Sequence, residues 1–334
     1  MGRLSPAGES FLAPSESEFV DFWGKLVGSL TARAAQRELG VGEKAHLDVE
    51  LLLDKPTAVG AMWIAMVAEE HAEIRWGART RYVDAKVRDT VNLEPLTNPP
   101  FHEGTQWPAG RHSMAFEGRI PQGARGSWGG WSPTHFAKAH EAAGAGPITS
   151  MGFRWQARIK VRVGRRMRGL SSPDVVVRAP ARRPTPQPAK ASPKGGISAR
   201  KKLELALHYS QASPGGRLLG GIKLSAPPDT KVRGVRVELV EDLYAVAKDG
   251  EGSSVTRRLS RTMARVSLEP PGPKPVRWSA EFALNVPNDS LSTEPGTMCS
   301  RTHHVMARAD LALARDLKAD LPVEILGPAF PSAR

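Results

Sequence analysis

Apolar and polar residues alternate with a period of two along much of this chain. The clearest case is 153–163, where every second residue is apolar and the residues between are polar or basic. Segments 203–209 and 232–240 show the same alternation. A period of two places one face of a strand in a core and the other in water. Such segments recur roughly every 8–15 residues with Gly, Pro and Asp between them, which predicts an all-β fold of sandwich type.

Two segments have a different pattern and are predicted to be short helices. In 15–28, Ser15 and Glu18 have the spacing of a capping box, and large apolar residues recur at helical intervals. The polar face of this segment is not rich in Lys or Arg, which favours a helix packed on the first domain over one on a membrane. The second segment is 132–143, with Ser132 as N-cap and Pro133 at the first helical position. The apolar residues of the first segment are Phe19, Phe22, Trp23, Leu26 and Leu30.

The two halves of the chain resemble each other, which predicts an internal duplication. Five short stretches match in the same order, each lying in or beside a strand-like pattern. The matching pairs are 41–44 with 214–217, 59–66 with 232–239, 91–95 with 266–270, 111–121 with 277–287, and 157–158 with 307–308.

A basic, Pro-rich segment separates the halves. The net charge is +13, but eight basic residues and no acidic one lie between Arg178 and Lys202, so the rest of the chain carries only +5. Repeated Pro favours extended geometry and disfavours a packed element. The predicted organisation is an N-terminal extension (1–28), a first β-sandwich (29–177), a linker (178–200), a second β-sandwich (201–328) and a tail (329–334).

These strand patterns resemble those of the arrestin-like superfamily. PGGRLLGGIKL followed by KVRGVRVELV resembles its opening strands, RWSAEFALNVPNDS a later strand, and HVMARADLAL with DLKADLPVEIL its closing pair. In the first half, GRHSMAFEGRIP and FRWQARIKVRV take the same places. The resemblance covers 30–177 and 201–326.

The resemblance implies two tandem immunoglobulin-like (arrestin-type) β-sandwich domains in a non-enzymatic adaptor or scaffold. Its members include arrestins, the arrestin-like retromer subunit and bacterial sporulation-control proteins. No counterpart of the buried charge cluster of visual-type arrestins is identifiable from the sequence. The linker is also longer and more basic than a rigid connection needs. The Ala- and Arg-rich composition suggests a bacterial source.

Catalytic, cofactor and metal motifs are not evident. The chain has no Gly-x-Ser-x-Gly elbow and no phosphate loop ending in Gly-Lys-Ser/Thr. The single cysteine, Cys299, cannot form an internal disulfide and is expected to be a half-buried structural residue. We therefore expect no enzyme activity and no cofactor. The least favoured alternative is an unrecognised hydrolase that uses Cys299 with His303 or His304, or the His135/His140 segment.

The sequence also predicts a cytoplasmic protein. No stretch approaches the ~20 apolar residues that span a bilayer, and no signal peptide is visible at the N-terminus.

Two candidate partner-binding features remain. The first is the loop 122–152, much longer than its counterpart 288–303, which carries Trp128, Trp131, His135 and Phe136. Long loops on rigid sandwiches often carry recognition; alternatively, the two Trp residues cover the open end of the sandwich.

The second feature is a basic strand face formed by Arg154, Arg158, Lys160 and Arg162 and continued by Arg165, Arg166 and Arg168. It suits phosphates or an acidic partner. The alternative is a solvated outer face balanced by acidic neighbouring strands. No stacking aromatic residues are interleaved with these charges in the sequence, which weakens single-stranded nucleic-acid binding.

The expected function is that of an adaptor that binds protein partners, acidic ones included, through loops and strand edges. The alternative is electrostatic association with nucleic acid or an anionic membrane through the linker and the basic face. Edge strands allow dimerisation, but no residue pattern specifies an oligomeric state from the sequence alone.

Overall fold

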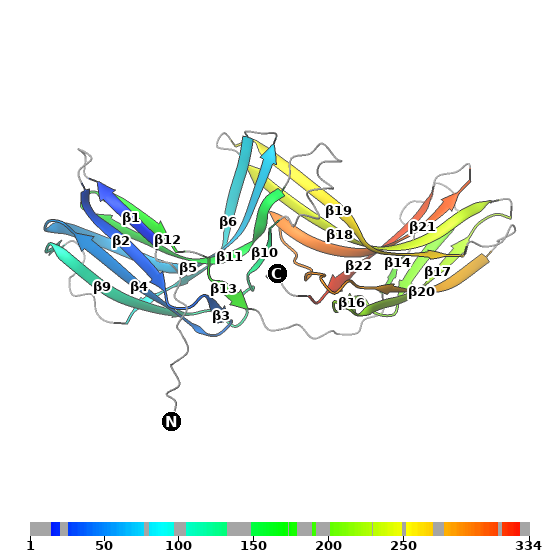
Figure 1. Ribbon diagram of the computed structural model, residues 1–334, viewed down its shortest axis with the longest axis horizontal. Coiled ribbons are helices and arrows are strands. Elements are labelled where there is room, and N and C mark those ends of the chain that lie inside the picture. The colour runs from blue at the N-terminus through cyan, green and yellow to red at the C-terminus, as the bar shows by residue number, and fades with distance from the viewer. Residues whose placement is uncertain are drawn as a thin grey trace, which may run out of the picture. The chain divides into compact units, whose positions relative to one another are not determined.

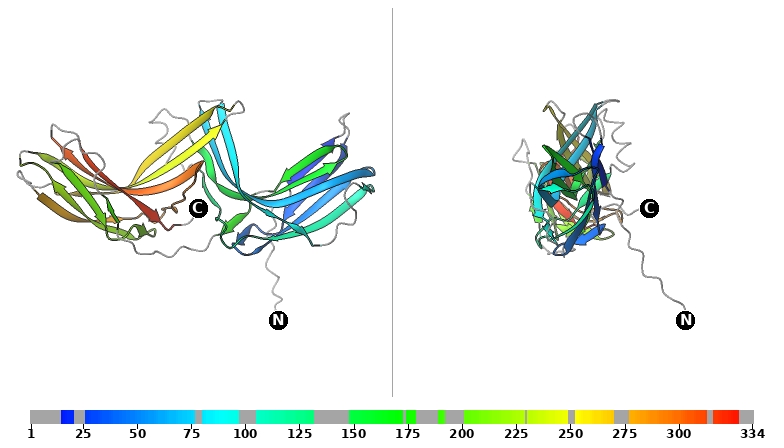
Figure 2. Two further views of the ribbon diagram at one scale, coloured as in Figure 1. Left: turned by 180° about the vertical axis from the view of Figure 1, so that it is seen from behind. Right: turned by 90° about the vertical axis from the view of Figure 1, so that its left-hand side faces the viewer.

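The computed structural model describes twelve stretches of the chain, and their regular structure is entirely β-strand, with no helix (Figures 1 and 2). Two compact units are present. Unit 1 comprises Met1–Glu70, Ala85–Ser127 and Phe153–Pro180, and unit 2 comprises His71–Asp84, Trp128–Gly152 and Ala181–Arg334. The described stretches are 15–20, 26–76, 80–96, 105–131, 148–172, 174–178, 189–191, 201–228, 230–248, 252–269, 277–312 and 316–327.

The first half of the chain contains two larger sheets. One is five-stranded and antiparallel, with the order β1-β2-β4-β9-β7. The other has the order β10-β11-β5-β6, with β12 paired to β11 and β8 to β5, while β3 and β13 form a small parallel pair. The bounds are β1 (Ser15–Val20), β2 (Leu26–Ala34), β3 (Glu38–Gly40), β4 (Lys44–Leu53), β5 (Thr57–Trp76), β6 (Thr80–Asn92), β7 (Glu94–Pro95), β8 (Gln106–Trp107), β9 (Gly110–Arg119), β10 (Trp128–Trp131), β11 (Ile148–Val163), β12 (Arg166–Ser171) and β13 (Val176–Arg178).

The predicted N-terminal helix is wrong. Residues 15–20 form β1, which pairs antiparallel with β2 and is followed along the sheet by β4. The apolar residues of β2 also fit a period of two, because Leu30, Ala32 and Ala34 are all buried. Extended pairing satisfies the backbone polar groups through neighbouring strands, and this tertiary contact overrides the local helical pattern. The second predicted helix, 132–143, lies outside the described residues.

The second half contains a four-stranded sheet, β14-β15-β17-β20, and a five-stranded sheet, β16-β22-β21-β18-β19. β14 falls inside the predicted linker and pairs with β15, so that segment does include a strand, contrary to expectation. The bounds are β14 (Ala189–Ala191), β15 (Lys202–Leu207), β16 (Gln211–Ala212), β17 (Arg217–Ser225), β18 (Val232–Lys248), β19 (Ser254–Leu268), β20 (Arg277–Asn285), β21 (Cys299–Leu311) and β22 (Leu317–Ile325).

The strand order of the first half recurs in the second half. The path β1-β2-β4-β9 recurs as β14-β15-β17-β20, and β11-β5-β6 recurs as β21-β18-β19. The matching turns also agree in detail. Gly42 and Gly215 have φ of 84° and 75°, a conformation that favours glycine. Their N–H groups donate to the carbonyls of Ile120 and Val286, at 2.8 and 3.0 Å.

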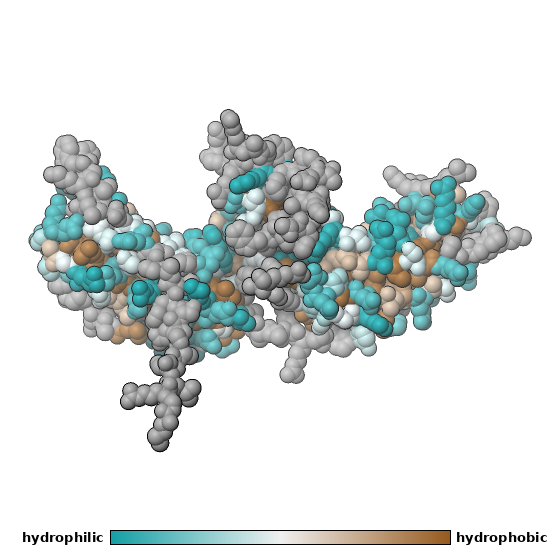
Figure 3. Space-filling model, in the orientation of Figure 1, coloured by the Kyte–Doolittle hydropathy of each residue, from teal (hydrophilic) through white to brown (hydrophobic). Residues whose placement is uncertain are grey.

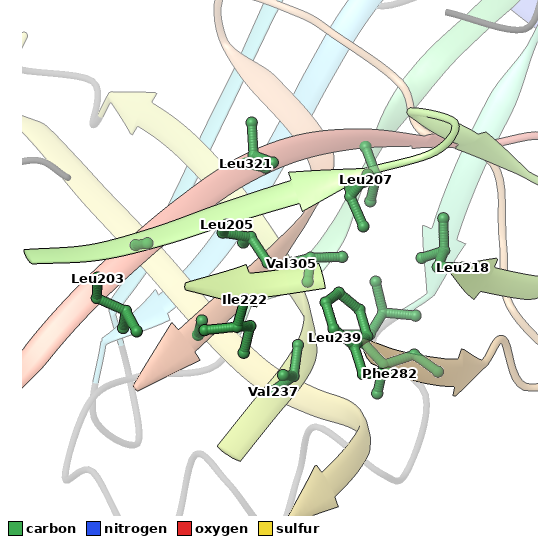
Figure 4. Packing of buried hydrophobic residues seen from close by; sticks show 14 of the residues in the cluster. Leu203, Leu205, Leu207, Leu218, Ile222, Val237, Leu239, Phe282, Val305 and Leu321 are labelled. Atoms are coloured by element: carbon green, nitrogen blue, oxygen red, sulfur yellow. The ribbon is translucent and has the colours of Figure 1, made fainter. Parts of the chain in front are cut away.

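Outward-facing strand positions are mostly polar or charged, and hydrophilic residues are interspersed with smaller hydrophobic groups on the visible described surface (Figure 3). The inward-facing positions of the second half form one apolar core between its two sheets (Figure 4). Leu205, Ile222 and Phe282 come from the four-stranded sheet, and Leu239 and Val305 from the five-stranded sheet. Burial of one apolar face per sheet therefore explains the period of two.

Candidate functional site

The predicted basic face lies on β11, and its strand alternation is confirmed. Phe153, Trp155 and Ile159 are buried, while the basic residues between them point to the opposite, outer face. β11 lies beside β5 on one side and pairs with β12 on the other. The outer face of β11 is thus flanked by two other strands, whose side chains determine whether each basic residue forms an ion pair.

Two of the four predicted cations are neutralised by a buried carboxylate on β5. Glu69 is only 1% exposed, and its Oε1 lies 2.6 Å from Nη2 of Arg154. Arg158 contacts Oε2 of the same carboxylate, and Arg154 also lies 3.9 Å from Asp174. At this end of the face, the alternative of a basic surface balanced by acidic neighbours holds. Arg154 and Arg158 stabilise a buried charge and are not free to bind a partner.

The other two predicted cations have no such partner. Lys160 and Arg162 are exposed, and neither lies within 4.0 Å of a carboxylate among the described residues. The Nζ of Lys160 lies 5.4 Å from the ring centroid of Trp63 on β5, a cation–π arrangement. Trp63 Nε1 donates to Asn92 Oδ1 at 3.2 Å. An aromatic residue from the neighbouring strand thus lies beside these charges, although none is interleaved with them in the sequence.

The basic surface continues around the β11–β12 hairpin. Gly164 has φ of 60° in the two-residue turn between Val163 and Arg166. Arg165 and Arg166 are exposed there, and neither forms an ion pair with a described residue. Arg166 and Arg168 lie opposite the inward-facing Val163 and Val161, so they point to the other face of the hairpin from Lys160 and Arg162, contrary to the prediction of one continuous basic face. Met167 lies opposite Arg162 across the hairpin and is 54% exposed. We define the hairpin site as Trp63, Lys160, Arg162, Arg165, Arg166 and Met167.

Trp63 and Met167 were missed by sequence reasoning because they lie on neighbouring strands. The sequence carried no clear signal for Trp63, because 63–68 is apolar throughout. Ile64 and Met66 are buried on β5, but Ala65 and Val67 are buried too, so alternation in this stretch does not by itself place Trp63. Its contacts with Lys160 and Asn92 place Trp63 on the outer side of the sheet.

The predicted aromatic loop is only partly described. Trp128 is 1% exposed, with its ring centroid 5.6 Å from the guanidinium carbon of Arg301. This burial fits a Trp that covers the interior of unit 2 more closely than a surface anchor. Trp131 ends β10, but its side chain, like all of His135 and Phe136, lies outside the described residues.

A buried charge cluster lies beyond the apolar core of the second half, on the inner face of β18 and β21. Glu241 Oε2 lies 2.7 Å from Arg261 Nε, and its Oε1 lies 3.7 Å from both Arg301 Nε and His303 Nε2. The side chain of Arg301 is 2% exposed. His303 Nδ1 is 2.8 Å from the hydroxyl of Thr293. A backbone N–H of β22 also donates to that hydroxyl, which ties the loop before β21 to the sheet.

The surroundings of Glu241 keep it ionised. Burial raises the pKa of this carboxyl, but the nearby His303, Arg261 and Arg301 lower it more, and the net pKa lies below its ordinary value. For Arg301, burial lowers the pKa, and the charge of Glu241 opposes that effect. Sequence analysis did not find this cluster, because its members come from three strands.

Acid pH is expected to weaken this cluster. Because the pKa of Glu241 lies below 4.5 in the folded chain, its contribution to stability is complete above that pH and is lost as pH falls through the folded pKa. The free energy of unfolding of the wild type should therefore fall more steeply between about pH 5 and pH 3 than that of Glu241→Gln. Urea denaturation at a series of pH values measures both slopes, and equal slopes would contradict the assignment.

Among the described residues of the hydrolase alternative, Cys299, His303 and His304 are not assembled as one exposed site, while His135 and His140 lie outside the described residues. Cys299 is fully buried, and its thiol donates to the carbonyl of Gly152 at 3.4 Å, an environment typical of an inert cysteine. His303 and His304 face opposite sides of β21, since one contacts Glu241 and the other lies 3.5 Å from Asp242. No cluster of three or more metal-ligating side chains occurs in the described part of the chain.

A separate hollow of ≈ 620 Å³ lies on the outer face of β2, β4 and β9. Its charges are of both signs, and Arg111 Nε lies 3.3 Å from Glu50 Oε1 within it. It contains none of the predicted site residues. Its polar lining consists of Thr31, Arg33, Asp48, Glu50, Arg111 and Ser113.

No helix in the described part of the chain is both long and apolar enough to cross a membrane. In comparisons of the full sequence, no protein-family model matches it, and no curated protein shows significant similarity to it.

Proposed function

We propose that this chain is a non-enzymatic adaptor with two tandem immunoglobulin-like (arrestin-type) β-sandwich domains, which binds an acidic protein partner through the hairpin site. The twice-repeated strand order and the core between two sheets support the sandwich assignment. Fold alone does not identify a function. The functional assignment therefore rests on the hairpin site.

The hairpin site has the composition of a protein interface. Arg, Trp and Met are enriched in such interfaces, and the site supplies all three: Met167 lies directly opposite Arg162, and Trp63 lies beside Lys160. Its four cations lack ion-pair partners among the described residues, whereas Arg154 and Arg158 on the same strand have one. Charges left unpaired beside an exposed Met suit carboxylates of a partner that also contributes an apolar contact.

The test is a binding experiment with a charge-matched control. The full chain serves as bait in nuclease-treated, detergent-cleared extract of the source cells, beside Lys160→Gln/Arg162→Gln and the control Arg217→Gln/Lys223→Gln. The control residues are exposed on β17, remote in sequence from the hairpin. We expect a stoichiometric protein partner with the wild type and the control, bound at least about tenfold more weakly by the hairpin variant. Equal retention by both variants would contradict the proposed site.

The second candidate function is electrostatic binding of nucleic acid or anionic lipid. It is favoured by the same four cations together with the basic segment 178–202. Against a stacking role, the indole N–H of Trp63 is already bonded to Asn92 and one ring face lies near Lys160. Recovery of nucleic acid or lipid alone, lost steeply with added salt, would favour this alternative.

A further inference from the structure

Strand β6 ends its sheet, and no other described strand pairs with its free edge (Figure 1). It is thirteen residues long. A free edge of this length presents unpaired backbone N–H and C=O groups that can accept another strand. Natural proteins often protect such edges with charged side chains, proline or bulges.

β6 has no proline, and its charged residues, the exposed Lys86 among them, alternate with exposed apolar residues. Val83 and Val87 are 54% and 47% exposed, and Ala85 between them is also exposed. Alternation along the strand places all three on one face. This is an apolar stripe at a free sheet edge, the pattern that predicts strand pairing.

The order of charges on β6 is self-complementary about Ala85. In an antiparallel pair related by a two-fold axis through this residue, each position before the centre lies opposite the equally distant position after it. Asp84 then faces Lys86 of the other copy, and Val83 faces Val87. One pair further out, Tyr82 faces Arg88. At the centre, Ala85 lies opposite Ala85 of the other copy, and these small side chains fit there without crowding.

The other long, charged edge strand shows the contrast. β19 ends the second five-stranded sheet and contains four Arg but no acidic residue. Pairing β19 with a second copy offers no cation an opposite charge, and several antiparallel registers set Arg directly opposite Arg, which is destabilising. β19 is therefore protected against self-pairing, while β6 combines complementary charges with an apolar stripe.

We infer that two copies of this chain associate through antiparallel pairing of their β6 strands, centred on Ala85, to form a symmetric dimer with a sheet continuous across the two-fold axis. The interface would contain cross-strand Asp84–Lys86 pairs on one face and the Val83, Ala85 and Val87 stripe of both copies on the other. This inference does not depend on the proposed adaptor function, because it concerns a different strand and a different partner.

Charge reversal at two positions tests the register. Sedimentation velocity of the full chain at increasing concentration should show a dimer. Lys86→Asp sets aspartates opposite each other, and Asp84→Lys sets lysines opposite each other, so each variant alone should dissociate at least about tenfold more readily. An equimolar mixture of the two variants, and the double variant Asp84→Lys/Lys86→Asp, should both recover the dimer. Lys223→Asp, on the exposed side of β17, is the control.

Three results would overturn the inference. The first is a wild type that stays monomeric up to about 100 µM. The second is a dimer that both single reversals leave intact, which would place the contact elsewhere. The third is loss of the dimer in the single variants with no recovery in the mixture, which would show that the two positions are not opposite each other. Circular dichroism establishes that each variant is folded.

Discussion

Glu241→Ala is expected to lower the free energy of unfolding by about 3–5 kcal/mol. The carboxylate lies between Arg261 and Arg301, and the side chain of Arg301 is 2% exposed. Without Glu241, the Arg301 guanidinium remains buried with its principal counter-charge removed. Removing one member of a buried ion pair is far more costly than replacing the pair by apolar residues, because the remaining charge has neither water nor a partner.

Urea denaturation followed by far-UV circular dichroism measures this effect. Glu281→Ala on β20 is the matched control, because Glu281 is exposed and its loss should change stability by no more than about 0.5 kcal/mol. Glu69→Ala makes an informative third variant. Arg154 and Arg158 are about one-third exposed, so they can turn toward water when Glu69 is removed, and the cost should be smaller. Equal costs at Glu69 and Glu241 would refute this account of burial.

Trp155→Ala is expected to lower the free energy of unfolding by about 3–5 kcal/mol through its effect on unit 1. Trp155 on β11 is fully buried, and its ring lies 6.5 Å from that of Phe153 in an edge-to-face arrangement. Its Nε1 donates to the carbonyl of Arg125 at 3.0 Å. The substitution leaves a large cavity and also removes the donor to a carbonyl that Trp155 helps to bury.

The outward-facing Trp63 provides the control for this experiment. Trp63→Ala removes the same type of side chain from the opposite face of the neighbouring strand, where water can fill the space. Its cost should be clearly smaller, about 1–2 kcal/mol. Unfolding measured by far-UV circular dichroism is suitable for both variants because it does not depend on the fluorescence of the lost indole. A Trp63→Ala variant as unstable as Trp155→Ala would mean that Trp63 is part of the core and not of a binding surface.

The candidate site was predictable in part. Lys160 and Arg162 could be assigned to an outer strand face from the alternation of 153–163 alone. The sequence could not show that Arg154 and Arg158 are paired while Lys160 and Arg162 are not. That difference depends on Glu69, which lies 85 positions from Arg154 in the chain. Sequence-local reasoning treats four similar charges alike; only the neighbouring strand distinguishes them.

The predicted N-terminal helix illustrates the same limit for secondary structure. The capping pattern at Ser15 and the apolar spacing that follows are compatible with a helix, yet β1 and β2 form at the edge of an existing sheet. Local propensity is worth little per residue, and pairing with a neighbouring strand outweighs it.

The sequence by itself determined that the chain is all-β over most of its described length and that its two halves repeat. Each strand must bury one face, which enforces a period of two, and matching turns such as those at Gly42 and Gly215 require glycine wherever they occur. The tertiary structure decided which charges are buried in pairs, which stay free at the hairpin site, and that β6 is an edge. The complementary order of residues around Ala85 is visible in the sequence, but it can direct strand pairing only because β6 has a free edge. Strand order is a non-local property, because it is set by contacts between residues far apart in the chain.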